Sequence, residues 1–188
     1  MNLKTISLSL LLSSVLSVLS VAQTASGVKT FNASGLSFDY PDTWTISDDS
    51  NGDAQQLTLA QPKSDVQIRV FVHKGHITPE KFPDAKKAFI DPYIASTVKQ
   101  FDAMGGKPQQ SADTSEIAGV KADGVKVAAN LGEPGAAKIY WVLLGQRVVI
   151  MTIFGPDREI KESMPAWDMV RNSLKIEDKA TPKPSPKP

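Results

Sequence analysis

Lys138 to Phe154 has the sequence KIYWVLLGQRVVIMTIF, and this stretch decides the fold. Two apolar runs flank Gly145-Gln146, which suits a two-residue hairpin turn, so the runs are predicted to be antiparallel neighbouring strands. An antiparallel strand with one face in water would alternate apolar and polar residues, whereas both faces of these strands are apolar. One face carries Ile139, Trp141, Leu143, Val148, Ile150 and Phe154, and the other carries Tyr140, Val142, Leu144, Val149, Met151 and Ile153. We therefore expect other elements to cover both faces.

A helical region that could supply the first cover is predicted from Thr78, with Pro79 in its first turn. Pro83 and Pro92 are expected to interrupt it. Its clearest continuous part follows Pro92 and is expected to end at Gly105-Gly106, because glycine readily adopts the left-handed conformation that ends many helices. The apolar face of this part carries Ile94, Val98, Phe101 and Met104.

A second helix is predicted near the C-terminus, where apolar residues recur at helical spacing. Pro165 indicates that this helix bends there or begins near Ser163. The apolar residues are Ile160, Met164, Trp167, Val170 and Leu174. With one helix on each side of the hairpin, the sequence predicts an α+β fold: an α/β/α sandwich with a central antiparallel sheet flanked by helices.

Alternating apolar residues predict further strands before and between these elements. A strand over 36–40 ends at the Pro41-Asp42 turn, after which Trp44 and Ile46 resume the alternation. Residues 115–131 are predicted to form a hairpin that turns near Ala118-Gly119. The inward side chains of the remaining predicted strands are Leu57, Leu59, Val66, Ile68, Val70 and Val72.

Several of these segments resemble the PsbP-like superfamily, which includes PsbP and DcrB-like envelope proteins. They are GLSFDYPDTWTI (35–46), EIAGVKA (116–122), the paired apolar strands, and WDMVRNSLK (167–175). The resemblance covers residues 31–176 and implies the same α/β/α sandwich. It also implies a non-enzymatic role in binding or assembling other proteins, commonly at a membrane-associated complex. No metal-binding residue of PsbP matches a motif in this chain.

The two ends of the chain differ from the part between them. Residues 1–22 begin with Lys4, continue as a serine-diluted apolar run, and are predicted to be a secretory signal peptide cleaved before Gln23 or near Ala25. This region lacks the cysteine that lipid attachment requires. Residues 177–188 are rich in proline and lysine and are predicted to be a disordered, solvated tail, with weak contact to anionic envelope polymers as the alternative. Residues 27–176 are expected to form one PsbP-like domain.

Composition excludes several classes of function. The 21 Lys and Arg residues nearly balance the 20 Asp and Glu residues, without the clustered basic excess of a nucleic-acid-binding protein. The chain has no cysteine, which excludes disulfides, thiol catalysis and thiolate metal sites. Beyond the predicted signal peptide, no transmembrane segment is expected.

His73 and His76 are the two histidines of the chain, and they are the candidates for metal chemistry. Two imidazoles near the end of a strand could hold zinc or copper, with Asp65 or Glu80 as a third ligand. The alternative is a pair of exposed polar residues where a strand gives way to a loop. We favour this alternative because the spacing defines no third ligand, and we assign no metal or cofactor site.

Two polar stretches lack the spacing of known binding loops. DDSNGD (48–53) lacks the glycine and glutamate that a calcium loop requires, and it is interpreted as a polar hairpin turn. GEPGAAK (132–138) lacks phosphate-loop spacing and is interpreted as a loop. Trp141 and Trp167 are expected in the core. Trp44 is interpreted either as a partly exposed anchor for a partner or as the closure of a sheet end.

No nucleophile or acid–base pair stands out in the sequence, so no catalytic residue is assigned. The chain is expected to be a secreted or periplasmic, non-catalytic binding or assembly module that contacts a protein partner in the cell envelope. The alternative is a small metal-binding protein or metal-dependent enzyme that uses His73 and His76.

Overall fold

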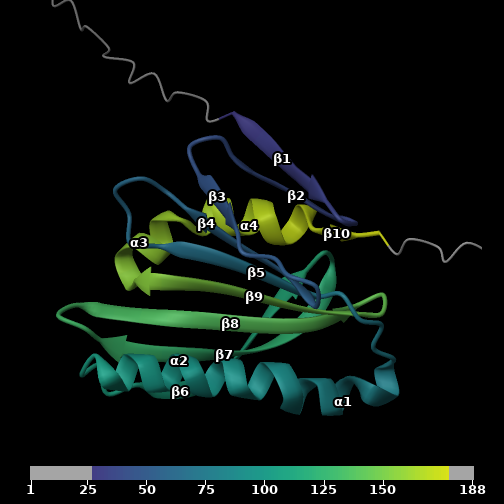
Figure 1. Cartoon of the computed structure of the whole chain (residues 1–188). Coiled ribbons are helices and arrows are strands. Elements are labelled where there is room, and N and C mark those ends of the chain that lie inside the picture. The colour runs from purple at the N-terminus through teal and green to yellow at the C-terminus, as the bar shows by residue number, and fades with distance from the viewer. Residues whose placement is uncertain (1–26, 178–188) are drawn as a thin grey trace, which may run out of the picture.

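A computed structural model describes residues 27–177, so the predicted signal peptide and residues 178–188 of the predicted tail lie outside the described residues. The described residues form three layers (Figure 1). A seven-stranded antiparallel sheet lies in the middle, with the helical segment that contains α2 against one face. The other face is covered by α3, α4 and a three-stranded sheet. The predicted α+β fold, with a central antiparallel sheet flanked by helices, is confirmed.

The two sheets divide the strands unequally. In order across the large sheet, the strands are β3 (Thr45–Asp48), β4 (Ala54–Ala60), β5 (Gln67–His73), β9 (Arg147–Pro156), β8 (Pro134–Leu144), β7 (Val120–Asn130) and β6 (Gln109–Ile117). The small sheet contains β1 (Val28–Ala33), β2 (Leu36–Pro41) and β10 (Lys175–Ile176) in the order β1-β2-β10. The strand predicted over 36–40 is β2, but it belongs to this second sheet, which the sequence did not predict.

The central hairpin of β8 and β9 has the predicted register and burial. Leu144 pairs with Arg147. Gly145 between them has a φ of 60°, a left-handed conformation that glycine adopts without a steric penalty. The face with Tyr140 and Met151 packs into one apolar cluster with α4, and the opposite face packs into a second cluster with α2. The residues of these two faces that are buried are Ile139, Tyr140, Trp141, Val142, Leu144, Val148, Val149, Ile150, Met151 and Ile153. Both faces of the hairpin are therefore covered.

The helical segment before β6 is continuous, so the interruptions predicted at Pro83 and Pro92 are wrong. It changes its hydrogen-bond spacing instead of ending, and its parts are the 3₁₀ turn η1 (Pro79–Lys81), α1 (Phe82–Ala85), the π turn η2 (Lys86–Ile90) and α2 (Asp91–Ala103). In a regular α-helix the ring of Pro92 would meet the carbonyl of Ala88. The wider π turn directly before Pro92 accommodates the proline without breaking the helix.

The C-terminal end of α2 is closed by two glycines, as predicted. The Gly105 N–H donates to the carbonyl of Asp102, and the Gly106 N–H donates to the carbonyl of Phe101, which is the Schellman pattern. Gly105 has a φ of 82°. Met104 does not join the packed face as predicted, because the side chain at this turn remains 59% exposed.

The second helical layer breaks near Ser163, as predicted from Pro165. It consists of α3 (Asp157–Glu162) and α4 (Met164–Ser173). The buried apolar residues of this layer and of the position that follows it are Ile160, Ala166, Trp167, Val170 and Leu174. The Trp167 ring lies 5.7 Å from the Tyr140 ring, centroid to centroid, so α4 is packed directly on the central hairpin.

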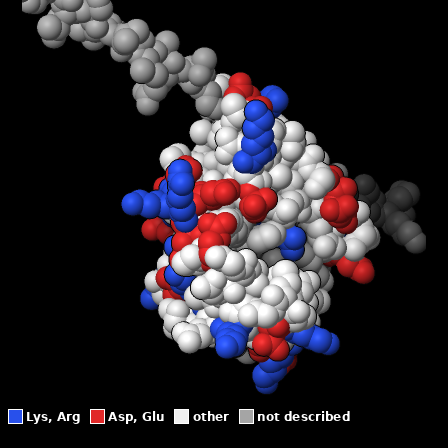
Figure 2. Space-filling view, turned by 90° about the vertical axis from the view of Figure 1, so that its left-hand side faces the viewer, with Lys and Arg blue, Asp and Glu red and all other residues white. Residues whose placement is uncertain are grey.

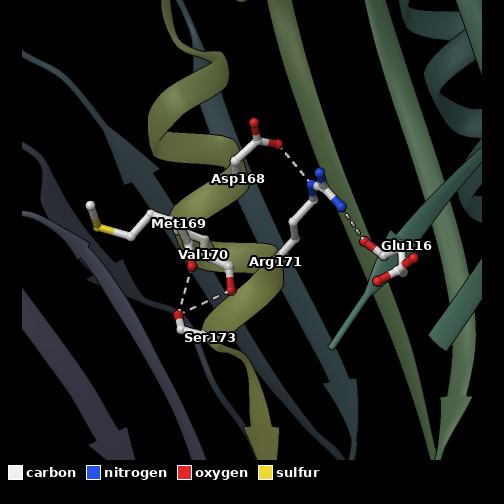
Figure 3. Close-up of polar contacts among 6 residues, drawn as sticks. All are labelled: Glu116, Asp168, Met169, Val170, Arg171 and Ser173. Carbon is white, nitrogen blue, oxygen red and sulfur yellow. Dashed lines mark hydrogen bonds and ion pairs between the residues drawn. The ribbon is translucent and has the colours of Figure 1, made fainter. Parts of the chain in front are cut away.

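Polar contacts fix the end of α4 to both sheets, and Figure 3 shows the contact with the large sheet. The Ser173 hydroxyl donates to the carbonyl of Met169, 2.6 Å away, and accepts a hydrogen bond from the N–H of Asp39 in β2. Arg171 donates from Nε to Asp168 and from Nη1 to the carbonyl of Glu116 in β6, both at 2.8 Å. The WDMVRNSLK segment thus joins the helix to strands from distant parts of the chain.

The contact with Glu116 also closes part of an open sheet edge, because β6 is the last strand of the large sheet. Ile117 and Val120 flank a two-residue turn and pair with each other, so the backbone groups of even-numbered β6 residues point away from β7. The Arg171 side chain donates a hydrogen bond to the outward carbonyl of Glu116. The carboxylate of Asp113 accepts a hydrogen bond from the outward N–H of Thr114. Hydrogen bonds from these side chains therefore satisfy backbone groups that could otherwise pair with another strand.

Asp113 is itself held by a contact that crosses three strands. The Tyr140 hydroxyl of β8 donates to Asp113 of β6 at 2.8 Å, and the ring passes over Gly124 of β7. A Cβ at Gly124 would lie 2.4 Å from the Tyr140 ring, so glycine is needed there. Burial, followed by the hydrogen bond and charge of Asp113, raises the pKa of Tyr140.

The Tyr140→Phe substitution is expected to lower the free energy of unfolding by about 1–2 kcal/mol at neutral pH, because a partly buried hydrogen bond to a carboxylate is lost. The pKa of the Tyr140 hydroxyl is higher in the folded state than in the unfolded state, where it is about 10. The stabilisation is therefore complete below about pH 10 and is lost as the pH rises through the folded-state pKa. Urea unfolding between neutral and alkaline pH measures the difference. A difference that did not shrink at alkaline pH would contradict this assignment.

The Arg171→Ala substitution is expected to lower the free energy of unfolding by about 1–2 kcal/mol, because two hydrogen bonds of a charged side chain are lost. It also exposes the outward carbonyl of Glu116, so weak self-association through β6 should increase. Urea unfolding and sedimentation velocity measure these effects. Arg158→Ala is the control, because Arg158 makes an exposed ion pair with Glu162 worth at most about 0.5 kcal/mol. Equal losses in the two variants would contradict a structural role for Arg171.

Candidate interaction surface

The two histidines lie near each other in sequence but have separate partners. The His73 ring lies 4.6 Å from the Phe89 ring, centroid to centroid, and its Nδ1 accepts a hydrogen bond from the N–H of Gly75. His76 is exposed and its Nδ1 shares a 2.9 Å hydrogen bond with Gln146. Within residues 27–177, no group of three or more His, Asp or Glu residues is placed to hold a metal ion. The described part of the chain therefore supplies no third ligand for the metal hypothesis.

The tryptophans are part of the core. Trp141 and Trp167 are buried, as predicted, and the Lys86 ammonium lies 5.4 Å from the centre of the Trp141 ring. Trp44 is 4% exposed and belongs to the cluster beneath the small sheet. The interpretation of Trp44 as an exposed anchor is therefore wrong, and its closure of a sheet end is supported.

The polar turn over 48–53 also has a structural role. The Asn51 side chain accepts hydrogen bonds from the N–H groups of Asp53 and Ala54, and this shapes the connection between β3 and β4. The interpretation of DDSNGD as a hairpin turn is confirmed. The stretch 132–138 differs from its prediction, because β8 begins at Pro134 and leaves only a short turn after Asn130.

That short turn borders an apolar hollow of about 310 Å³ at one end of the molecule. The hollow lies between the end of α2, the turn from β7 to β8, and the end of β9. We call it the Leu131 hollow, and its lining is Asp65, Phe101, Met104, Ala129, Leu131, Glu133, Gly135, Ala136, Phe154, Gly155 and Pro156. A smaller cavity of about 100 Å³ continues along α2 and shares Phe101, Met104 and Phe154 with it.

Small residues in neighbouring strands create the floor of the Leu131 hollow. Ala136 of β8 pairs with Gly155 of β9, and Gly135 lies beside them. A Cβ at Gly135 would lie 2.9 Å from the carbonyl oxygen of Gly155, and a Cβ at Gly155 would lie 2.9 Å from the Val66 side chain. The close approach at Gly135 leaves no room for a larger side chain on the side of α2, and Gly155 is held close to Val66 on the opposite side.

Exposed apolar side chains stand at the margin of the hollow. Met104 is 59% exposed and Leu131 is 43% exposed. Leu131 lies against Gly106, where a Cβ would be 2.8 Å from the leucine side chain. On the inner side, the Arg69 guanidinium lies 4.5 Å from the centre of the Phe154 ring and holds it in place. The hollow therefore combines a fixed aromatic wall with two solvent-facing apolar side chains.

Carboxylates border the hollow on the side of α3. Asp65 and Glu133 line the hollow itself, and Glu133 also lines an adjoining polar depression of about 510 Å³ with Glu159 and Glu162. We call these four residues the acidic rim. Figure 2 looks onto this end of the molecule and shows Asp and Glu side chains gathered across the middle of the face, above an uncharged area. Lys63 and Arg158 line the same depression, so the rim carries an excess of negative charge.

Glu159 is fixed within the rim by hydrogen bonds. The Ser64 hydroxyl donates to its carboxylate at 2.7 Å, and the N–H of Asp65 donates to the same oxygen at 2.9 Å. These two donors, in that order, lower the pKa of Glu159 below its ordinary value, and the positive charge of Arg158 adds to the effect. Glu159 is therefore a permanent negative charge at neutral pH.

This surface was not predicted from the sequence. Two features of the sequence point to it. Small residues occupy paired positions in β8 and β9, and the large apolar residues Met104 and Leu131 lie in turns, where side chains are usually exposed to solvent. Within the described residues, no helix is long and apolar enough to cross a membrane. The arrangement offers a recessed apolar site beside fixed negative charge, which suits binding of another molecule.

Searches with the sequence find no matching family model and no matching curated protein. Solved structures do match. A protein from Bacteroides thetaiotaomicron VPI-5482 is 18% identical with a TM-score of 0.54, and the match covers 83% of this chain. It covers 51% of the Bacteroides protein, so this chain spans about half the length of that relative.

Two further solved structures are similar at lower scores. Cyanobacterial PsbP from Synechocystis sp. PCC 6803 is 14% identical with a TM-score of 0.48, covering 86% of this chain and 99% of that one. LpqN, described as involved in cell envelope biogenesis of Mycobacterium tuberculosis, is 15% identical with a TM-score of 0.43, covering 84% and 88%. At these identities the likeness concerns the fold.

Proposed function

We propose that this chain is a secreted or periplasmic, non-catalytic binding or assembly module that contacts a protein partner in the cell envelope. In this proposal residues 1–22 direct export, residues 27–176 form one PsbP-like domain, and residues 177–188 are a solvated spacer. The predicted export signal and the PsbP-like segments of the sequence support the location and the class of function. The partner is proposed to bind at the Leu131 hollow.

The observation that carries this proposal is the pair of exposed apolar side chains beside the hollow. Among residues 27–177, the exposed large hydrophobic side chains are Val28, Met104, Val120 and Leu131, and two of the four meet here. Exposed apolar groups around a concave, preformed site are typical of interaction surfaces, where burial of a few large side chains supplies most of the affinity. Val28 and Val120 have no such hollow beside them among the described cavities.

Photo-crosslinking in cells tests this proposal. A benzophenone amino acid placed at Leu131 of the full chain is expected to give one crosslinked product of defined mass in the envelope fraction. The Met104→Ser substitution should reduce its yield, because it removes apolar surface from the margin of the hollow. Immunoblotting and mass spectrometry measure the product and identify the partner.

Val120 provides the matched control position, because its side chain has the same 43% exposure as Leu131. The same probe at Val120 should give no defined product. Products of equal yield from both positions, or none from Leu131, would contradict binding at the hollow. Recovery of the unprocessed chain from the cytoplasm would contradict the proposed location.

A further inference from the structure

We infer that the Leu131 hollow accepts a cationic polypeptide segment: one large apolar side chain enters the hollow, and Lys or Arg residues beside it face the acidic rim. This inference rests on the proposed function and adds the chemistry of the partner. It follows from the size of the hollow, from the charge around it, and from the poor fit of the other occupants that the chain itself offers.

The size of the hollow fits one anchoring side chain. Its volume of about 310 Å³ lies at the lower end of the range of about 300–1,000 Å³ for ligand sites. Phe101, Phe154 and Leu131 provide aromatic and aliphatic contacts, while Asp65 and Glu133 line its edge. A leucine or phenylalanine could be buried there, and the residues next to it in its own chain would then lie beside these carboxylates.

The charge of the rim selects cationic neighbours. The acidic rim has four carboxylates, whereas the basic residues that line the same depression are Lys63 and Arg158. Arg158 is already paired with Glu162. Glu159 is held ionised by Ser64 and by the backbone of Asp65. Charge of one sign concentrated at a binding site attracts segments of opposite charge and rejects segments of like charge. The chain as a whole is almost neutral, so this excess is a local property of the site.

Two occupants from the chain itself fit poorly. A second copy that placed the same surface against itself would bring two acidic rims together, and this repulsion opposes a symmetric dimer. Residues 178–188 carry three lysines but no large apolar residue, so they could meet the rim and would leave the hollow empty. An anionic lipid surface would be repelled by the rim. A basic segment of another protein satisfies both parts of the site.

A titration with defined peptides tests this chemistry on the purified protein. Three capped peptides of equal length serve as probes, with the sequences GKKLKKG, GKKSKKG and GEELEEG. Backbone amide shifts of ¹⁵N-labelled protein report the affinity and the position of binding. We expect GKKLKKG to bind most tightly, with shifts centred on Phe101, Leu131, Glu133 and Gly155. Raising the ionic strength from about 0.01 M to about 0.15 M should weaken it, because the screening length falls from about 30 Å to about 8 Å.

Paired variants separate the apolar contribution from the charge contribution. Met104→Ser with Leu131→Ser should reduce affinity for GKKLKKG by about tenfold or more, as expected for truncated anchor contacts. Asp65→Asn with Glu133→Gln should reduce it by about three- to tenfold, the effect of two partly exposed charge pairs. The controls are Val28→Ser with Val120→Ser, and Asp84→Asn with Asp123→Asn, which remove apolar surface or negative charge in the same way at exposed positions outside the hollow. The controls should bind like the unaltered protein.

The inference is overturned if GKKSKKG or GEELEEG binds as tightly as GKKLKKG, if the shifts lie elsewhere, or if the controls weaken binding as much as the paired variants. Failure of the inference can be distinguished from failure of the proposed function. No peptide binding together with a retained crosslink at Leu131 overturns the partner chemistry alone. Peptide binding without a crosslink in cells overturns the envelope partner and leaves the chemistry of the hollow supported.

Discussion

The structure depends on one constraint: the hairpin of β8 and β9 must be shielded from water on both faces. Burial of Met151 on one face and Ile150 on the other requires two covering layers. The layers that meet this requirement are unequal. A helix about 10 Å wide lies on one face of a sheet whose seven strands, spaced about 4.8 Å apart, span almost three times that width. The face under α2 is therefore covered only in part, and recesses such as the Leu131 hollow lie alongside the helix.

Sequence patterns predicted the elements whose periodicity is strong. The two-sided apolar runs around Gly145 gave the central hairpin, and the glycine pair after Ala103 gave the end of α2. They failed where pairing is decided by distant residues. β1 is mostly exposed, with Phe31 packed against the core, and β10 contains two residues that pair with β2. Such strands are stabilised mainly by pairing with a neighbouring strand. This pairing depends on residues far away in the sequence, so local periodicity does not predict it.

The interaction surface was hidden from the sequence for a different reason. A motif search finds single short segments, whereas the Leu131 hollow is formed where the end of α2, the turn from β7 to β8 and the end of β9 come together. The acidic rim is likewise assembled from three separate segments, around Asp65, Glu133 and Glu159. Its charge excess does not show in the nearly neutral composition. Both features are properties of the folded arrangement.

The π turn over Lys86–Ile90 has a consequence for the length of the chain. Each residue of a regular α-helix advances about 100° around the axis, and at that rate Val98 and Phe101 would lie about 100–180° around the helix from Phe82 and Phe89. The extra residue absorbed by the wide turn corrects the phase, and all four side chains pack into the same apolar cluster. Deleting one residue from this turn would restore regular winding and rotate half of the apolar stripe away from the sheet.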